Sequence, residues 1–171
     1  YNAQAGDYFA KQIGNIFTGY ERAMREAGAV DFDDLLVLTA KMLRKHADIR
    51  RECTDRWRYL MIDEYQDTNH AQFVIASLLA GDVGMDAPEG TDQPGPNICV
   101  VGDPDQAIYG WSGADISNIL DFEQQYPGAA VIPLGENFRS TAPILAAADT
   151  LIRKNEVRKH KDLFTRREGG E

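Results

Sequence analysis

The sequence predicts an α/β fold in which short parallel strands alternate with helices. Residues 59–62 and 97–101 are apolar runs of the length and composition that a buried parallel strand requires. A helix signal at 70–80 lies between these two runs. With 171 residues and 43% hydrophobic content, the chain can bury a sizeable core in one domain, or in one domain and part of another.

Three helices are expected before the first strand. The first has apolar residues at spacings of three and four, which mark one face of a helix, and we expect this face to pack in the core. Its members are Phe9, Ile13, Ile16, Tyr20 and Met24, and Gly28 can end the helix. The second helix begins at Asp31 or Asp33, ends near Lys45, and is expected to turn Leu35, Leu38 and Met42 inward. A short third helix is expected at 48–53.

Asp63 and Glu64 directly follow the first apolar run, where such a strand would leave its sheet. Ligands of α/β proteins bind in the crevice outside the carboxyl ends of the strands. Neighbouring side chains of an extended segment point to opposite sides, so one carboxylate can hold a metal ion while the other reaches a water. The alternative is that both acids only solvate the strand end. Asn69 and Gln72 do resemble a capping box that opens the helix at 70–80, which Gly81 can end.

The second apolar run leads into a loop at 102–115 that combines turn-forming residues, acids and two aromatic residues. Its glycines and its proline argue against regular structure, so we expect Tyr109 and Trp111 on the surface. Exposed aromatic faces suit the stacking of nucleic acid bases, which contributes about 1–3 kcal/mol per base. The alternative is that Trp111 fills the core, which is the commoner place for a tryptophan.

The remainder of the chain predicts a helix at 116–126, a strand at 129–134, a turn at 135–139 and a further helix. Ser140 or Thr141 can cap that helix, with Pro143 in its first turn. Residues 153–167 hold seven Lys and Arg, which indicates a solvated helix face and tail rather than a DNA-binding patch. Residues 81–96, with four Gly and three Pro, predict an exposed loop.

Three segments together resemble the signature of superfamily 1 DNA helicases of the UvrD, PcrA and Rep type. Asp-Glu-Tyr-Gln-Asp-Thr-Asn at 63–69 matches helicase motif II, and Gly-Asp-Pro-Asp-Gln-Ala-Ile-Tyr-Gly-Trp at 102–111 matches motif III. Asn-Phe-Arg-Ser-Thr at 137–141 matches motif IV, and residues 31–36 resemble the segment that leads into motif II. The order and spacing of the motifs are preserved from about residue 30 to the C-terminus.

The resemblance implies a role for each matching residue. Asp63 would hold Mg²⁺, and Glu64 would be the general base for the water that attacks the γ-phosphate of ATP. Gln106 would sense that phosphate, and Arg139 would reach it from a second RecA-like domain as an arginine finger. Phe138 stands where the family usually has a tyrosine stacked on adenine, and it keeps the stacking face.

The same resemblance implies a DNA site and a domain division. Tyr109 and Trp111 would stack on single-stranded DNA. The fold would be a partial RecA-like parallel sheet of the P-loop NTPase type, flanked by helices and lacking the phosphate-loop strand. Residues 1–130 would be the C-terminal part of the first RecA-like domain, with a helical lead-in at 1–56, and residues 131–171 would begin the second.

The triphosphate-binding half of such a site is absent from the sequence. No Gly-x-x-x-x-Gly-Lys-Ser/Thr occurs, and residues 59–138 hold thirteen Asp and Glu but no Lys or Arg. We therefore expect the phosphate loop and the later motifs on polypeptide outside these residues, and no ATP hydrolysis by this chain alone. The net charge of −9 also argues against tight binding of the DNA backbone.

These features predict a fragment of a cytoplasmic ATP-dependent DNA helicase whose partners are ATP, single-stranded DNA and the rest of its own polypeptide. Cys53 and Cys99 lack the spacing of a zinc site and are expected to be reduced core thiols. Three alternatives are the helicase subunit of a RecB or AddA type recombination nuclease, a non-catalytic nucleic-acid-binding remnant, and a free-standing metal-dependent phosphohydrolase that uses Asp63, Glu64 and Asp67.

Overall fold

The computed structural model describes residues 8–81, 97–155, 158–159 and 161–169. Two short strands, β1 (Leu60–Ile62) and β2 (Ile98–Val100), form a parallel pair in which Leu60 lies opposite Ile98 and Ile62 opposite Val100. Both strands fall inside the predicted apolar runs, so the α/β prediction is confirmed. The predicted loop at 81–96 lies outside the described residues except for Gly81.

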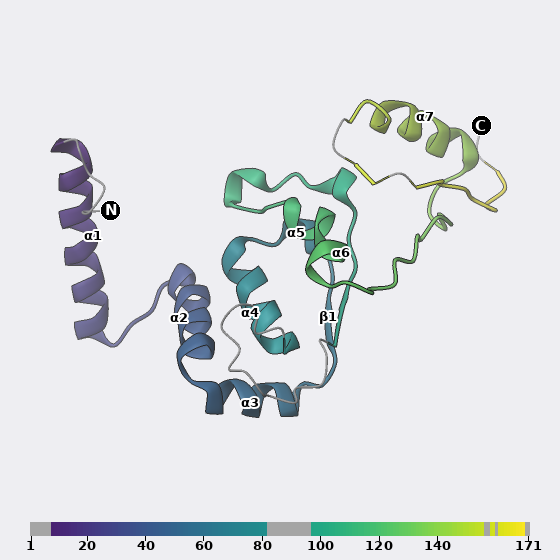
Figure 1. Ribbon diagram of the computed structural model, residues 1–171. Helices are drawn as coiled ribbons and strands as arrows, with labels where there is room; N and C mark the ends of the chain where they lie inside the picture. The colour runs from purple at the N-terminus through teal and green to yellow at the C-terminus, as the bar shows by residue number, and fades with distance from the viewer. Residues whose placement is uncertain (1–7, 82–96, 156–157, 160, 170–171) are drawn as a thin grey trace.

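Helix α4 (His70–Ala80) connects the two strands and lies between the sheet and the helix α2 (Phe32–Lys45), as Figure 1 shows. Its predicted capping box is present: the Asn69 side chain accepts from the Gln72 backbone, and the Gln72 side chain accepts from the Asn69 backbone. Gly81 ends the helix with a φ of 85°, a left-handed conformation that favours glycine.

The main hydrophobic cluster lies where α2, α3 (Ala47–Arg56) and α4 meet. Leu43 is 2% exposed and packs with Val74 and Leu78 of α4. The expected inward residues of α2 are wrong, since Leu35, Leu38 and Met42 are 55%, 45% and 38% exposed. The residues of α2 that pack in this cluster are instead Leu43 and Ala40.

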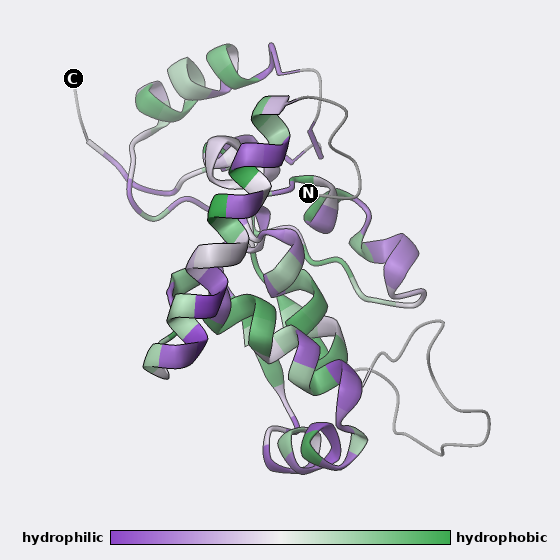
Figure 2. Cartoon of the chain, turned by 90° about the vertical axis from the view of Figure 1, so that its left-hand side faces the viewer, coloured by the Kyte–Doolittle hydropathy of each residue, from purple (hydrophilic) through white to green (hydrophobic). Residues whose placement is uncertain are grey.

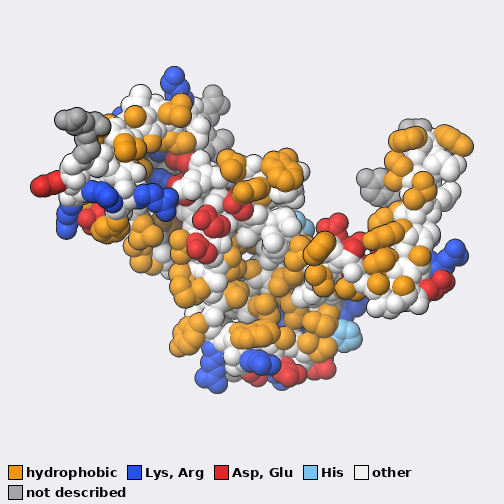
Figure 3. Space-filling model, turned by 180° about the vertical axis from the view of Figure 1, so that it is seen from behind, with side chains coloured by type: hydrophobic (Ala, Val, Ile, Leu, Met, Phe, Trp, Pro, Cys, Tyr) orange, Lys and Arg blue, Asp and Glu red, His pale blue; other side chains and the backbone are white. Residues whose placement is uncertain are grey.

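Helix α1 (Tyr8–Ala27) stands apart from this cluster, with its apolar face exposed. Phe9 is 69% exposed and Ile16 is 72% exposed, and hydrophobic side chains form a column along this helix at the right of Figure 3. The expectation that this face packs in the core is therefore wrong. The predicted helix is confirmed, but its apolar residues are not covered by another described element.

The chain after β2 forms two single 3₁₀ turns, η3 (Pro104–Gln106) and η4 (Gly110–Ser112), and two short helices. The helix expected at 116–126 is divided into α5 (Ser117–Leu120) and α6 (Phe122–Gln125), because the backbone at Asp121 (ψ 6°) leaves the helical conformation. Ile119 and Tyr126 from this region are buried.

Residues 129–134 form no strand, so the predicted strand is wrong. Val131, Ile132 and Leu134 are 58%, 76% and 73% exposed, and no described segment pairs with them as a sheet neighbour. Helix α7 (Ala142–Ile152) follows, with Thr141 at its N-cap position and Pro143 in its first turn as expected. Green colouring over much of α7, the uppermost helix of Figure 2, reflects its apolar composition.

The two cysteines are free thiols, as expected. Cys53 is half-buried against the main cluster, whereas Cys99 on β2 is exposed, so its placement in the core is wrong. Within the described ranges, no helix combines the length and apolar character needed to cross a membrane.

Candidate active site

The turn after β1 exposes both predicted carboxylates. Ile62 O accepts from Val101 N at 2.8 Å, and the side chains of Asp63 and Glu64 then project from the end of the strand into solvent. Glu64 adopts a left-handed backbone (φ 50°, ψ 43°), which is uncommon for a residue other than glycine. Glu64 N donates to Asp63 Oδ1 at 2.9 Å, which helps to hold this sharp turn.

Gln66, which was not predicted from the sequence as a site residue, is a buried side chain that connects the two acidic turns. It is 1% exposed, and its Nε2 donates to Glu64 Oε2 at 2.7 Å and to Asp67 Oδ2 at 3.4 Å. Its Oε1 accepts from Asp103 N at 3.0 Å, so one buried amide joins the Glu64 carboxylate to the backbone of the turn after β2. A polar side chain in a buried turn beside two carboxylates is the one local signal that could have revealed it.

Gly102 permits this approach between the two turns. A Cβ atom at this position would lie 2.5 Å from Gln66 Oε1 and 2.7 Å from Ile119 Cδ1, distances at which something must move. Glycine is therefore required here by space rather than by backbone conformation.

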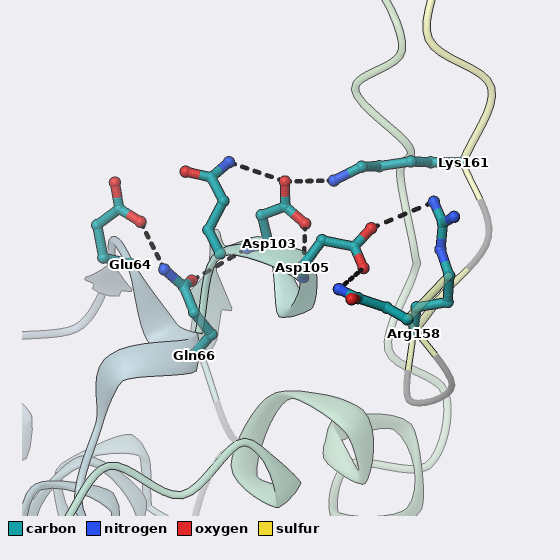
Figure 4. Close-up of polar contacts among 8 residues, drawn as sticks. Glu64, Gln66, Asp103, Asp105, Arg158 and Lys161 are labelled. Carbon is teal, nitrogen blue, oxygen red and sulfur yellow. Dashed lines mark hydrogen bonds and ion pairs between the residues drawn. The ribbon is translucent and has the colours of Figure 1, made fainter. Parts of the chain in front are cut away.

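The turn after β2 carries Asp103, Asp105 and Gln106, and Figure 4 shows their contacts. Asp103 Oδ1 accepts from Asp105 N at 3.0 Å, which caps the 3₁₀ turn, and Asp103 Oδ2 accepts from Gln106 Nε2 at 2.8 Å. Gln106 is exposed. The structure thus brings Glu64 and Gln106 together through Gln66 and Asp103, at the ends of adjacent strands.

The basic run at 153–167 contacts this same turn, contrary to the expectation of a solvated face and tail. Arg158 forms an ion pair of 3.2 Å with Asp105, and Lys161 forms another with Asp103. Burial on its own raises the pKa of Asp103, but the hydrogen bonds from Lys161 and Gln106 outweigh burial and lower this pKa below its ordinary value.

The loop at 107–115 presents its aromatic residues to solvent. Trp111 is 84% exposed and Tyr109 is 45% exposed, with their ring centroids 6.1 Å apart, so the alternative of a core tryptophan is wrong. The end of the loop is joined to the turn after β1, because Asp115 N donates to Thr68 O at 2.9 Å and buried Asn118 Nδ2 donates to the same oxygen at 3.0 Å.

Phe138 and Arg139 are exposed in the turn before α7, and Phe138 is 78% exposed. Asn137 Oδ1 accepts from the backbone N of Arg139 at 2.9 Å and of Ser140 at 2.7 Å, which shapes this turn. Among the described residues, Arg139 forms no ion pair with Asp63 or Glu64. The structure does not bring the predicted arginine finger to the acidic pair.

Asp63 fits the requirements of a magnesium ligand. Its side chain is exposed, and Mg²⁺ binds through one or two carboxylates while keeping several water or phosphate oxygens. Within the described part of the chain, no group of three or more His, Cys, Asp or Glu is placed to hold a metal ion.

Comparison with known proteins defines the class of protein. Residues 1–127 match the sequence model of the UvrD/REP helicase N-terminal domain, and this match covers most of the chain. The chain therefore belongs to the UvrD/REP helicase family.

Among curated proteins, the chain is similar to the ATP-dependent DNA helicase PcrA of Staphylococcus aureus, with 41% identity over 168 residues. It is also similar to the protein of the same name from Staphylococcus epidermidis, with 40% identity over 168 residues. In both comparisons, 98% of this chain corresponds to 21% of the relative. The chain spans about a fifth of the length of the curated relatives that it matches.

Proposed function

We propose that this chain forms part of the RecA-like motor of an ATP-dependent DNA helicase, and that ATP hydrolysis requires further polypeptide. The observation that carries the proposal is the connection between Glu64 and the turn bearing Gln106, through the buried Gln66 amide. Family membership and the similarity to ATP-dependent DNA helicases support the choice of reaction.

In the proposed site, Glu64 acts as general base and accepts a proton from the water that attacks the γ-phosphate. Its exposed carboxylate can meet a nucleotide, while the bond of 2.7 Å from Gln66 fixes its orientation. Asp63 would hold Mg²⁺, which supplies neutralisation of the triphosphate charge. Gln106 would donate a hydrogen bond to the γ-phosphate instead of to Asp103.

Two further site residues are proposed to act once the chain closes on a nucleotide. Arg139 would approach the γ-phosphate as an arginine finger, and Phe138, 78% exposed, offers a face for adenine. Residues 131–171 would begin the second motor domain, and the end of the family match at residue 127 supports a boundary near 130. The exposed positions of both side chains are compatible with a role at an interdomain cleft.

Tyr109 and Trp111 are proposed to stack on bases of single-stranded DNA. Their exposed rings follow Gln106 within five residues, so a change at the nucleotide can alter the grip on DNA over a short distance. Base stacking needs no positive charge, which suits a loop in which Gly110 and Ser112 flank the tryptophan.

The test is a Glu64→Gln substitution in the intact protein. Removing the base is expected to lower kcat for ATP about 10²–10⁴-fold while leaving the affinity for ATP nearly unchanged, because the amide keeps the size of the carboxylate. Glu52→Gln on the exposed surface of α3 makes the same chemical change away from the site and is the control. Turnover that survives Glu64→Gln, or turnover by the 171-residue chain alone, would contradict the proposal.

A further inference from the structure

A basic segment near the C-terminus holds the turn after β2 through two carboxylates (Figure 4). Arg158 Nη2 lies 3.2 Å from Asp105 Oδ2, and the two side chains are only 13% and 5% exposed. Asn155 Nδ2 donates to the other oxygen of Asp105 at 3.3 Å, across fifty residues of sequence. Lys161 Nζ contacts Asp103 Oδ2. The acids of this turn are thus neutralised by a distant part of the chain.

One oxygen atom connects this segment to Gln106. Asp103 Oδ2 accepts from Gln106 Nε2 at 2.8 Å and also contacts the Lys161 ammonium group. If Gln106 turns toward another acceptor, Asp103 keeps a charged donor on the same oxygen. Without Lys161, the departure of Gln106 would leave a partly buried carboxylate oxygen without a side-chain donor, which is costly.

We infer that Lys161 is a positioning residue for Gln106, and that Arg158 and Asn155 anchor the segment that carries it. Lys161 keeps Asp103 paired whether or not Gln106 is bonded to it, so Gln106 can exchange Asp103 for a phosphate oxygen at low cost. The inference rests on the proposed function in one respect, which is the contact of Gln106 with ATP. Lys161 belongs to the proposed second motor domain, so its contact also makes Gln106 responsive to movement of that domain.

The neighbouring Lys159 provides a matched control. It lies two residues away and pairs with Glu123 of α6 at 2.5 Å, with side-chain exposures of 36% and 52%. A Lys159→Ala variant removes the same charge from the same segment without removing a donor from Asp103. A difference between Lys161→Ala and Lys159→Ala therefore isolates the contact with the turn.

The first measurement is hydrogen exchange of the 171-residue chain, and it does not involve ATP. Lys161→Ala is expected to speed exchange of the Asp105 and Gln106 amides about tenfold, because their acceptors in the Asp103 turn lose support. Lys159→Ala and Lys161→Arg should leave these amides close to the parent rate. Equal exchange in Lys161→Ala and Lys159→Ala would overturn the inference, as would an undiminished effect of Lys161→Ala in an Asp103→Asn background.

The second measurement is ATP turnover by the intact protein. Lys161→Ala is expected to lower kcat about tenfold with a smaller change in KM for ATP, and Lys161→Arg should restore most of kcat. A kcat equal to that of Lys159→Ala would overturn the inference. If Glu64→Gln kept full turnover while Lys161→Ala still sped exchange, the proposed function would fail and the contact between Lys161 and Asp103 would stand.

Discussion

Two adjacent parallel strands end in acidic turns that are stabilised in different ways. After β1, Asp63 and Glu64 are exposed, and their donors are neutral groups of the same turn, Glu64 N and the Gln66 amide. After β2, Asp103 and Asp105 are largely buried, and their side chains pair with Lys161 and Arg158 from far along the chain.

The difference separates acids that are available to a ligand from acids that hold the chain together. A carboxylate already paired with a cation has little remaining attraction for Mg²⁺, whereas an exposed carboxylate with neutral donors keeps it. This contrast supports Asp63 as the proposed magnesium ligand, and it supports the proposed role of the acids after β2 in positioning Gln106. Identical side-chain chemistry at equivalent strand ends acquires different roles through the charge of its neighbours.

The largest effect on stability is expected where the second turn loses its buried ion pair. Arg158→Ala leaves Asp105, 5% exposed, with Asn155 as its side-chain partner, and should lower the free energy of unfolding by about 2–3 kcal/mol. Asp63→Asn in the first turn should change it by less than about 0.5 kcal/mol. Urea denaturation of the two variants measures both values. Equal losses would show that the two turns are not stabilised differently.

A smaller effect is expected where the two turns touch. Gly102→Ala places a Cβ 2.5 Å from Gln66 Oε1 and 3.1 Å from Tyr65 N, and a backbone atom cannot move aside easily. The overpacking should cost about 1–3 kcal/mol and loosen the hold of Gln66 on Glu64. Gly110→Ala is the control, because a Cβ there meets nothing within 4 Å. Thermal unfolding measures the stability of the two variants. Equal stability would mean that the two turns can move apart at no cost in free energy.

Elements whose determinants lie within a few residues were predicted from the sequence. The capping box at Asn69 depends on a partner three residues away and is present where the sequence predicted it. Asp31, one of the two predicted helix starts, is the N-cap of α2, and it forms a capping box with Asp34 that was not predicted. The exposure of Asp63, Glu64 and Trp111 also followed from local order, because an acidic strand end and a glycine-rich loop are surface features.

Features that depend on distant partners were not predicted. Residues 129–134 have strand composition, but a strand needs a neighbour, and none of the described segments pairs with them. The basic run was read as solvated because its acceptors, Asp103 and Asp105, lie about fifty residues earlier. Gln66 was missed for the same reason, since its contact with Asp103 N spans 37 residues. The periodicity of apolar residues shows which face of a helix is apolar, but it does not show which element packs against that face.

A smaller effect than at Gly102 is expected at Tyr65, which lies beneath the first turn. Its side chain is fully buried, its ring meets Phe122 edge-on at a centroid distance of 5.8 Å, and its hydroxyl oxygen has no hydrogen-bond partner within the described residues. Tyr65→Phe removes this unpaired polar group and keeps the ring, so the free energy of unfolding near pH 7 should change by less than about 1 kcal/mol. Tyr59→Phe, at an 81% exposed position, is the control.

The pH dependence distinguishes the two tyrosines more sharply than stability at neutral pH. Burial, with a smaller contribution from Tyr126, raises the pKa of Tyr65 to about 12 from an ordinary value of 10.0. The unfolded chain therefore releases this proton first, and stability that is complete below pH 10.0 is lost as the pH rises toward about 12. Denaturation at pH 9 and pH 11 should show a steeper loss for the parent chain than for Tyr65→Phe. An equal loss of stability in the parent chain and in Tyr65→Phe would mean that the Tyr65 hydroxyl is in contact with water. Solvent would then reach the interior beneath the first turn.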